Sequence, residues 1–176
     1  GYANSKRSLL KACQKYVEDG FNYKMLILPS IYGPFNLNFS PKQMLNSIIL
    51  RAVKLSKKNQ KILDVRGDLN SMREYIFLPD IANWVSKNIE ILPALPVAMN
   101  LGTNASLPIY EYYKVCSNLL NLDLNFDINL LERKGLQDYE DFLDSTLASN
   151  FSWGLYTPVE EGIMRTIKYI EENYGI

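Results

Sequence analysis

Two side chains near the start of the chain, Tyr2 and Lys6, have the types and the spacing of an acid–base pair. Residues four apart on a helix lie on the same face. A tyrosine hydroxyl is a weak acid with a reference pKa of about 10, and a neighbouring ammonium group favours the phenolate form. Such a pair can deliver a proton to a carbonyl oxygen that is being reduced. The same spacing also fits an ordinary helix surface, and it recurs at Tyr110 and Lys114.

Composition excludes several other kinds of chemistry. The chain has 176 residues and no histidine, so His-ligated metal sites and histidine-based triads are ruled out within it. Its 19 basic and 19 acidic residues cancel, and we expect no nucleic-acid binding. No apolar run reaches spanning length and no signal peptide is recognisable, so we expect no membrane segment. We expect Cys13 and Cys116 to be buried, reduced thiols of a cytoplasmic protein.

The elements that position these side chains alternate between helix and strand, which predicts an α/β fold. Two matches to a capping box predict helix starts, at Ser40–Gln43 for a helix to about Lys58 and at Thr157–Glu160 for the last helix. Asp80 and Asp144 are the expected caps of two further helices. Periodicity predicts the other elements as helices at 2–19, 80–91 and 108–120, and as strands at 25–28, 61–65, 73–78, 97–102 and, more weakly, 124–128.

Five segments, in this order, resemble the C-terminal half of extended short-chain dehydrogenases/reductases, the NAD-dependent epimerase/dehydratase family. Among these the chain is most similar to the GDP-fucose synthases and related nucleotide-sugar 4-ketoreductases. The segments are YANSK (2–6), LILPSIYGP (26–34), SMREYIFLPDIA (71–82), MNLGT (99–103) and FSWGLYTPVEEGIMRTIKYI (151–170). The glycine-rich loop that binds the dinucleotide phosphates has no counterpart in the chain.

The resemblance implies the C-terminal part of a Rossmann-like parallel sheet and a small mixed α/β substrate-binding subdomain. Residues 1–35 would end the dinucleotide-binding domain. Residues 36–176 would form the substrate-binding region, interleaved with the last sheet strands at about 79–104. We therefore expect the chain to be part of a longer protein, beginning at the catalytic helix and lacking most of the cofactor site.

The resemblance also assigns roles to individual residues. Tyr2 would donate the proton, and Lys6 would be its partner and would bind the nicotinamide ribose. Arg73 would hold the nucleotide diphosphate, for which arginine offers a planar and permanently charged fork. A surface ion pair of Arg73 with Glu74 or Asp80 is the alternative.

Five further residues are weaker candidates. Arg51 could also reach the nucleotide, although arginines are common on helix surfaces. In members of the family, the nicotinamide contacts the end of the strand that corresponds to Pro29, Ser30 and Ile31. Backbone groups bind the cofactor there. Gln43 has a cofactor-proximal position in the chain, but its place in the capping box favours a structural role.

The function implied is an NAD(P)-dependent oxidoreductase acting on a nucleotide-linked sugar, as a 4-keto-sugar reductase or epimerase/reductase using NADP or NAD. A 4-epimerase or a 4,6-dehydratase is the alternative within the family. A non-catalytic nucleotide-sugar-binding or scaffold protein is the alternative outside it, because three family positions are lost. The family's arginine is Ile27 here, its histidine is Phe77, and its asparagine has no clear equivalent. By analogy with the family we expect a homodimer through the first helix, whose apolar residues Leu9, Leu10, Cys13 and Val17 form a wide stripe.

Overall fold

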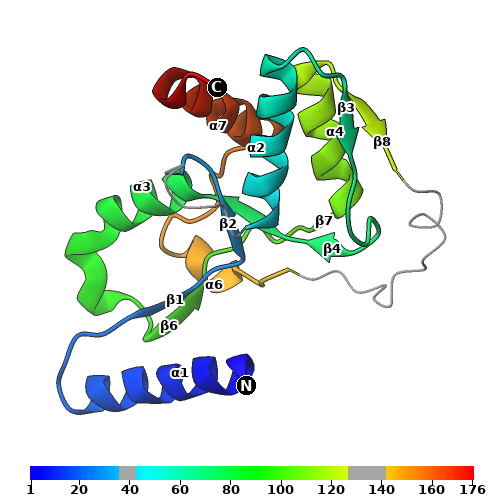
Figure 1. Cartoon of the computed structure of the whole chain (residues 1–176). Coiled ribbons are helices and arrows are strands. Elements are labelled where there is room, and N and C mark those ends of the chain that lie inside the picture. Colours follow the sequence, from blue (N-terminus) through cyan, green and yellow to red (C-terminus); the bar gives the residue numbers. More distant parts are fainter. Residues whose placement is uncertain (36–42, 127–141) are drawn as a thin grey trace.

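Figure 1 shows the computed structural model of the chain, which describes residues 1–35, 43–126 and 142–176. The helices are α1 (Tyr2–Glu18), α2 (Met44–Lys57), α3 (Leu78–Asn88), the 3-10 helix η1 (Ile89–Ala94), α4 (Ile109–Leu120), α6 (Thr146–Ser149) and α7 (Val159–Tyr174). The strands are β1 (Met25–Ile27), β2 (Ser30–Tyr32), β3 (Ile62–Asp64), β4 (Met72–Arg73), β5 (Tyr75–Phe77), β6 (Ala98–Asn100), β7 (Leu107–Pro108) and β8 (Asp123–Asn125).

Parallel pairing between strands far apart in the sequence confirms the predicted α/β class. Strand β1 pairs with β6, β2 with β5 and β3 with β8, all in parallel, whereas β4 and β7 are antiparallel. In the register Leu26 lies opposite Met99, and Ile31 lies opposite Ile76. Parallel strands need long crossovers, and helices supply several of them here. Strands β2 and β7 were not predicted, because Pro29 was interpreted as a strand break and Pro108 as the start of a helix.

Two hydrophobic cores hold the elements together. The larger core lies among α2, α4 and α7 (Figure 1). Five of the six residues of the predicted α2 stripe are buried in it, namely Leu45, Ile48, Ile49, Ala52 and Val53, whereas Met44 is only partly buried. The smaller core joins β5, β6 and α3 to the segment around α6, through Ile76, Ile81, Trp84, Met99 and Trp153. The rings of Trp84 and Trp153 meet edge to face, 6.1 Å between centroids.

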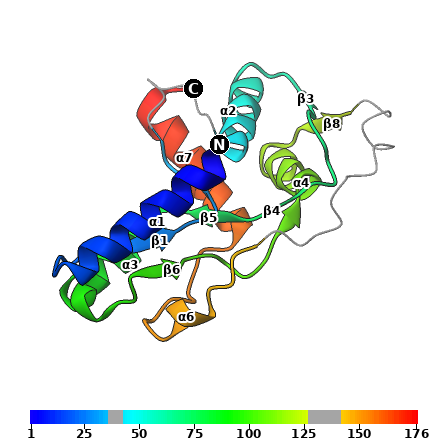
Figure 2. The ribbon, with the colours of Figure 1, turned by 90° about the horizontal axis from the view of Figure 1, so that it is seen from below.

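Helix α1 differs from every other long helix because none of its residues is buried. In Figure 2 it lies across β1, with no other element on its outer side. The expected burial of Cys13 is wrong, since this thiol is half-exposed, whereas Cys116 is buried as predicted. Burial raises the pKa of the Cys116 thiol to about 12. The apolar stripe of α1 is therefore a surface in this chain.

Both capping-box predictions were wrong in detail. The part of the first box at 40–42 lies outside the described residues, and Gln43 has an extended backbone with α2 starting at Met44. Thr157 caps nothing: its amide and hydroxyl donate to the two carboxylate oxygens of Asp80, at 2.7 Å and 2.8 Å. Asp80 is accordingly no cap either, and α3 starts two residues before it. The Asp80 carboxylate in α3 therefore binds Thr157, just before α7, and neither residue acts as a helix cap.

The other predicted elements are confirmed within a few residues. The strand expected at 73–78 is divided at Glu74 into β4 and β5, and Leu78 already belongs to α3. The helix expected at 80–91 continues from α3 into the 3-10 turn η1. The turn after Asp144 is present as α6, and Asp144 Oδ1 accepts hydrogen bonds from the amide and hydroxyl of Thr146. Strand β8 covers the start of the weakly predicted strand, whose last two residues lie outside the described ranges.

Among the described residues, no helix combines the length and hydrophobicity that spanning a bilayer requires. In the same residues, no three acidic or thiol side chains come together as a metal site.

The contact between Tyr32 and α7 allows a direct test of the packing. Tyr32 is buried, which raises the pKa of its hydroxyl, and this hydroxyl donates to the carbonyl of Val159 at 3.4 Å. A Cβ atom on Gly162 would lie well inside contact distance of the same hydroxyl oxygen. Glycine is therefore required at position 162 because the Tyr32 side chain packs directly against the helix backbone there.

We predict that Gly162→Ala lowers the free energy of unfolding by about 1–3 kcal/mol, because of overpacking, although alanine is the better helix former. In a Tyr32→Phe background, which lacks the nearest clashing atom but keeps the ring carbon Cζ at 2.8 Å, the same substitution should cost less. Urea denaturation of the four variants measures both effects. An equal or larger cost in the phenylalanine background would contradict the proposed contact.

Candidate active site

The first turn of α1 brings Tyr2 and Lys6 together, as their spacing predicts. The Lys6 ammonium nitrogen lies 5.3 Å from the centroid of the Tyr2 ring. The Tyr2 side chain is 78% exposed, so its hydroxyl is accessible to a ligand. The second pair with this spacing is engaged elsewhere: Lys114 pairs with Glu111 at 3.6 Å, and the ring of Tyr110 packs on Phe126. The two tyrosine–lysine pairs thus differ in structure: Tyr2 and Lys6 lie close to each other, whereas Tyr110 and Lys114 contact other residues.

Two hollows meet at Tyr2. The first, about 330 Å³ in volume and here called the Arg73 hollow, is lined by Tyr2, Leu28, Pro29, Ser30, Gln43, Arg73, Glu74, Phe142 and Leu143. The second, about 500 Å³ and called the Lys6 hollow, is lined by Tyr2, Lys6, Arg7, Leu10, Met25, Leu26, Ile27, Leu28, Pro29, Ile31 and Gln43. Their shared wall contains Tyr2, Leu28, Pro29 and Gln43, so a group beside Tyr2 has access to both hollows.

Strand β2 distributes its side chains between the two hollows. Successive residues of a strand point to opposite faces, and accordingly Ser30 lines the Arg73 hollow while Ile31 lines the Lys6 hollow. Pro29, directly before the strand, lines both. Of the three predicted cofactor residues, Ile31 therefore lies on the Lys6 side, Ser30 on the opposite side, and Pro29 borders both hollows.

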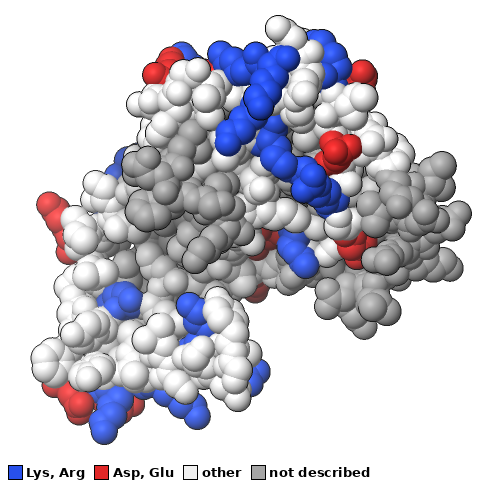
Figure 3. All heavy atoms as spheres, viewed as in Figure 1, with Lys and Arg blue, Asp and Glu red and all other residues white. Residues whose placement is uncertain are grey.

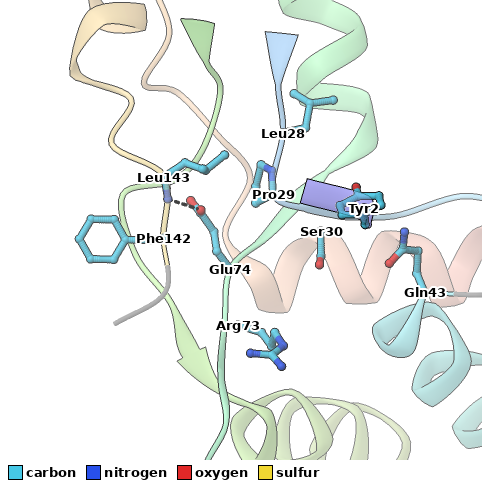
Figure 4. A pocket seen from close by; sticks show the side chains of 9 residues that line it. All are labelled: Tyr2, Leu28, Pro29, Ser30, Gln43, Arg73, Glu74, Phe142 and Leu143. Carbon is cyan, nitrogen blue, oxygen red and sulfur yellow. Dashed lines mark hydrogen bonds between the residues drawn. The ribbon is translucent and has the colours of Figure 1, made fainter. Parts of the chain in front are cut away.

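Arg73, the predicted diphosphate ligand, is the cation that lines the first hollow. Its Nη1 donates to the carbonyl of Met72 at 2.7 Å. The two carboxylates considered as alternative partners are engaged with other groups, Asp80 with Thr157 and Glu74 with Thr103 and Leu143. Figure 4 shows Arg73 at the lower edge of the hollow, on the other side of the chain from the bond between Glu74 and Leu143. An anionic group in this hollow would meet its guanidinium.

The carboxylate of Glu74 builds the far wall of the Arg73 hollow. Glu74 is only 4% exposed. Its Oε1 accepts hydrogen bonds from the backbone amide and, at 3.0 Å, from the hydroxyl of Thr103. Its Oε2 accepts one from the amide of Leu143 at 2.7 Å (Figure 4). A Cβ on Gly102 would lie 2.6 Å from Oε1, so glycine is needed beside this carboxylate. Leu143, and Phe142 before it, are thereby held against the sheet.

Arg51 lies away from both hollows at Tyr2. Its Nη1 donates to the carbonyl of Asp64 at 3.1 Å, and its Nη2 donates to the Tyr113 hydroxyl at 2.8 Å. It lines a separate hollow with residues of α2 and β3. The predicted contact of Arg51 with a nucleotide stays a prediction.

Sequence reasoning missed several wall residues. Gln43 was assigned to a helix cap, yet its side chain caps nothing and lines both hollows. The available sequence signal for a site position was its place directly before α2, in the segment that follows the Tyr32-Gly33-Pro34 turn. Phe142 and Leu143 follow a segment without hydrophobic pattern, so only the three-dimensional fold could place them at the site.

Comparison with known proteins defines the class of this fold and site. Residues 1–102 match the model of the NAD dependent epimerase/dehydratase family. The chain belongs to that family, as the resemblance implied.

Individual relatives agree. The chain is 30% identical over 173 residues to a GDP-L-fucose synthase of Azorhizobium caulinodans, covering 96% of this chain and 54% of that protein. It is 28% identical to a GDP-L-colitose synthase of Yersinia pseudotuberculosis, covering 96% of this chain and 55% of the relative. The chain thus spans about half the length of the curated relatives it matches.

Solved structures confirm the Rossmann-like α/β fold. A GDP-L-fucose synthetase from Naegleria fowleri bound to NADP superposes with a TM-score of 0.74 at 18% identity, over 99% of this chain and 55% of that one. A UDP-glucose 4-epimerase from Thermotoga maritima with UDP-glucose gives 0.73 at 18% identity, over 97% and 53% of the two chains.

The role of Glu74 generates a prediction for the site. Glu74→Gln places an amide NH₂ against backbone amides that are themselves donors, so at least one hydrogen bond to a charged acceptor is lost. We predict a loss of about 3 kcal/mol in unfolding free energy. Glu111→Gln, which removes an exposed carboxylate, is the control and should cost little.

Urea denaturation of both variants measures these costs. If both substitutions lowered the unfolding free energy by the same small amount, the proposed stabilising role of the buried Glu74 carboxylate would be wrong.

Proposed function

We propose that this chain supplies the proton donor and the substrate pocket of an NAD(P)-dependent reductase or epimerase/reductase for nucleotide-linked 4-keto sugars. The observation that carries the proposal is the position of Tyr2 between a hollow with a cation, Arg73, and a largely apolar hollow beside Lys6. A reaction between a diphosphate-linked sugar and a flat nicotinamide needs both kinds of surface next to one acid.

The residues of the Lys6 hollow fit one end of a nicotinamide cofactor. Leu10, Leu26 and Ile31 offer an apolar surface for a flat ring, and the Lys6 ammonium can donate to ribose hydroxyls. When bound, the cofactor supplies a hydride to the carbonyl carbon of the sugar. The chain would contribute only this end of the cofactor site. Residues 1–35 would complete a dinucleotide-binding domain, and 36–176 would form the substrate region.

Tyr2 then acts on the oxygen of that carbonyl. As hydride adds to the carbon, the oxygen becomes negative and takes the proton of the Tyr2 hydroxyl. The Lys6 ammonium stabilises the phenolate that remains, and the phenolate regains a proton from water. Arg73 pairs with the diphosphate and so holds the sugar beside Tyr2.

Two features also support a homodimer in a reducing compartment such as the cytoplasm. Helix α1 has no buried residue, and an exposed aromatic cluster of Tyr16, Phe21 and Tyr23 continues its surface. Cys13 and Cys116 are both free thiols, and unpaired cysteines are usual where the redox potential is low. A second copy of α1 is a suitable cover for this face.

We predict that Tyr2→Phe in the complete protein lowers the turnover of nucleotide-linked 4-keto sugars by about a hundredfold or more, the effect of losing a general acid. Tyr110→Phe, at the other tyrosine of this spacing, is the matched control and should retain full activity. Reduced-nicotinamide absorbance and the sugar product are followed together.

The outcomes separate the alternatives. Net cofactor oxidation that depends on Tyr2 supports the reductase. Sugar conversion without net oxidation assigns a 4-epimerase or 4,6-dehydratase instead. Nucleotide-sugar binding without any conversion assigns a binding or scaffold role, and equal activity of both variants contradicts Tyr2 as the donor.

For the dimer, we predict that light scattering of the complete protein gives twice the monomer mass. Leu9→Glu, on the exposed stripe of α1, should shift the mass toward the monomer, because it places a charge in an apolar contact. Leu155→Glu, at a fully exposed leucine far along the chain, is the control. A monomeric mass for the unmodified protein would contradict the proposed dimer.

A further inference from the structure

The strand that carries Arg73 is very short. Strand β4 contains only Met72 and Arg73, which pair with Pro108 and Leu107 of β7. Proline has no amide hydrogen to donate, so this ladder offers fewer hydrogen bonds than two longer strands would. After Arg73 the chain leaves β7, and β5 pairs with β2 instead. The position of Arg73 therefore depends on side chains outside the ladder.

The hydroxyl of Tyr112, on α4, supplies such a contact. It donates a hydrogen bond to the backbone carbonyl of Arg73 at 2.7 Å. The Tyr112 side chain is 1% exposed. Burial raises the pKa of its hydroxyl, against a smaller lowering by a hydrogen bond with the Leu107 backbone. The hydroxyl thus stays protonated, as a donor must, and contacts both residues of the register pair Arg73 and Leu107.

Other buried aromatic side chains fix the ring of Tyr112. This residue lies on the buried face of α4, in the larger core. Its ring meets that of Tyr75 edge to face, with 5.0 Å between the ring centroids. Tyr75 meets Tyr32 in the same way, at 6.2 Å. Edge-to-face contacts favour a defined ring orientation, so this row of three tyrosines presents the Tyr112 hydroxyl to Arg73 from a rigid support.

Packing alone does not account for the hydroxyl of Tyr112. A phenylalanine at this position would keep the ring contacts of the row. The hydroxyl adds a polar contact, and its acceptor belongs to the residue whose guanidinium lines the Arg73 hollow. Arg73 Nη1 also donates to the carbonyl of Met72 at 2.7 Å. Because the guanidinium is bonded to its own strand, a shift of the backbone at 72–73 would move the guanidinium as well.

We propose that Tyr112 is a positioning residue for Arg73: its hydroxyl holds the Arg73 backbone so that the guanidinium faces the hollow beside Tyr2. The inference rests on the proposed function, in which Arg73 binds the diphosphate of the nucleotide sugar. Tyr112 lines neither hollow at Tyr2, so it acts through Arg73 and does not touch the substrate. Positioning of this kind matters because a misplacement of about 1 Å can lower a rate by about a hundredfold.

The test uses the complete protein, with inorganic pyrophosphate titrated by calorimetry at low ionic strength. Figure 3 shows a band of basic side chains over α2, so pyrophosphate also meets cations other than Arg73. Four proteins are therefore compared: the unmodified protein, Tyr112→Phe, Arg73→Gln and the double variant. We expect Tyr112→Phe to weaken pyrophosphate binding by about fivefold to tenfold when Arg73 is present, and to leave it unchanged on Arg73→Gln.

Tyr32→Phe is the matched control. It also removes a hydroxyl from a buried ring of the row, but that hydroxyl donates to the carbonyl of Val159 on α7. Pyrophosphate binding should therefore stay unchanged in this variant. Urea denaturation shows whether each variant is folded under the conditions of the titration.

Two results would overturn the positioning role: unchanged pyrophosphate binding in Tyr112→Phe, or an equal weakening with and without Arg73, which a general structural effect would produce. A different result would overturn the proposed function. If Arg73→Gln itself left pyrophosphate binding unchanged, Arg73 would not be the diphosphate ligand, and Tyr112 would have nothing to position. The titrations need no catalysis, so they distinguish these failures even if no turnover is found.

Steady-state kinetics give a second readout. In Tyr112→Phe we expect the KM for the nucleotide sugar to rise by about fivefold to tenfold with kcat unchanged, because a diphosphate contact is made equally in the ground state and the transition state. A fall in kcat with KM unchanged would contradict the positioning of a diphosphate ligand.

Discussion

The buried carboxylate of Glu74 is the interaction on which the geometry of the site depends. It joins three segments that are far apart in the sequence: its own position between β4 and β5, the end of β6 through Thr103, and the wall of the hollow through Leu143. A buried carboxylate is costly unless its oxygens are fully hydrogen-bonded, so these segments are strongly held together. Arg73, one residue earlier, is thereby fixed at the edge of the hollow.

Glu74 also explains two local features of the backbone. Gly102 lies against it where a Cβ would not fit. The predicted strand at 73–78 is interrupted at Glu74: β4 before it pairs with β7, and β5 after it pairs with β2. One polar interaction therefore sets both the course of the chain and the position of the cation that would receive the substrate.

The sequence predicted what depends on short-range pattern or on motif order. The spacing of Tyr2 and Lys6 placed both on one helix face, and the stripe of α2 was found by its period. The sequence failed where distant groups replaced local ones. Asp80 and Thr157 each had the sequence of a helix cap, but they bond to each other across 77 positions. Phe142 and Leu143 reach the site only through the tertiary fold, so no local signal in the sequence could reveal them.

Tyr2 lies in the first turn of the exposed helix α1, so the exposure of this helix also determines the surroundings of Tyr2. The chain spans about half the length of its curated relatives, and under the proposed function the residues of the Lys6 hollow would provide one side of a cofactor site. Tyr2 is exposed on that side and borders the Arg73 hollow on the other. In the proposed reaction the chain would therefore supply the acid and the substrate side.

The most direct test of this account is a crystal structure of the complete protein with a nucleotide sugar bound. We predict the diphosphate on the guanidinium of Arg73 and a sugar oxygen within hydrogen-bonding distance, about 3 Å, of the Tyr2 hydroxyl. A diphosphate bound away from Arg73, with the sugar remote from Tyr2, would contradict it.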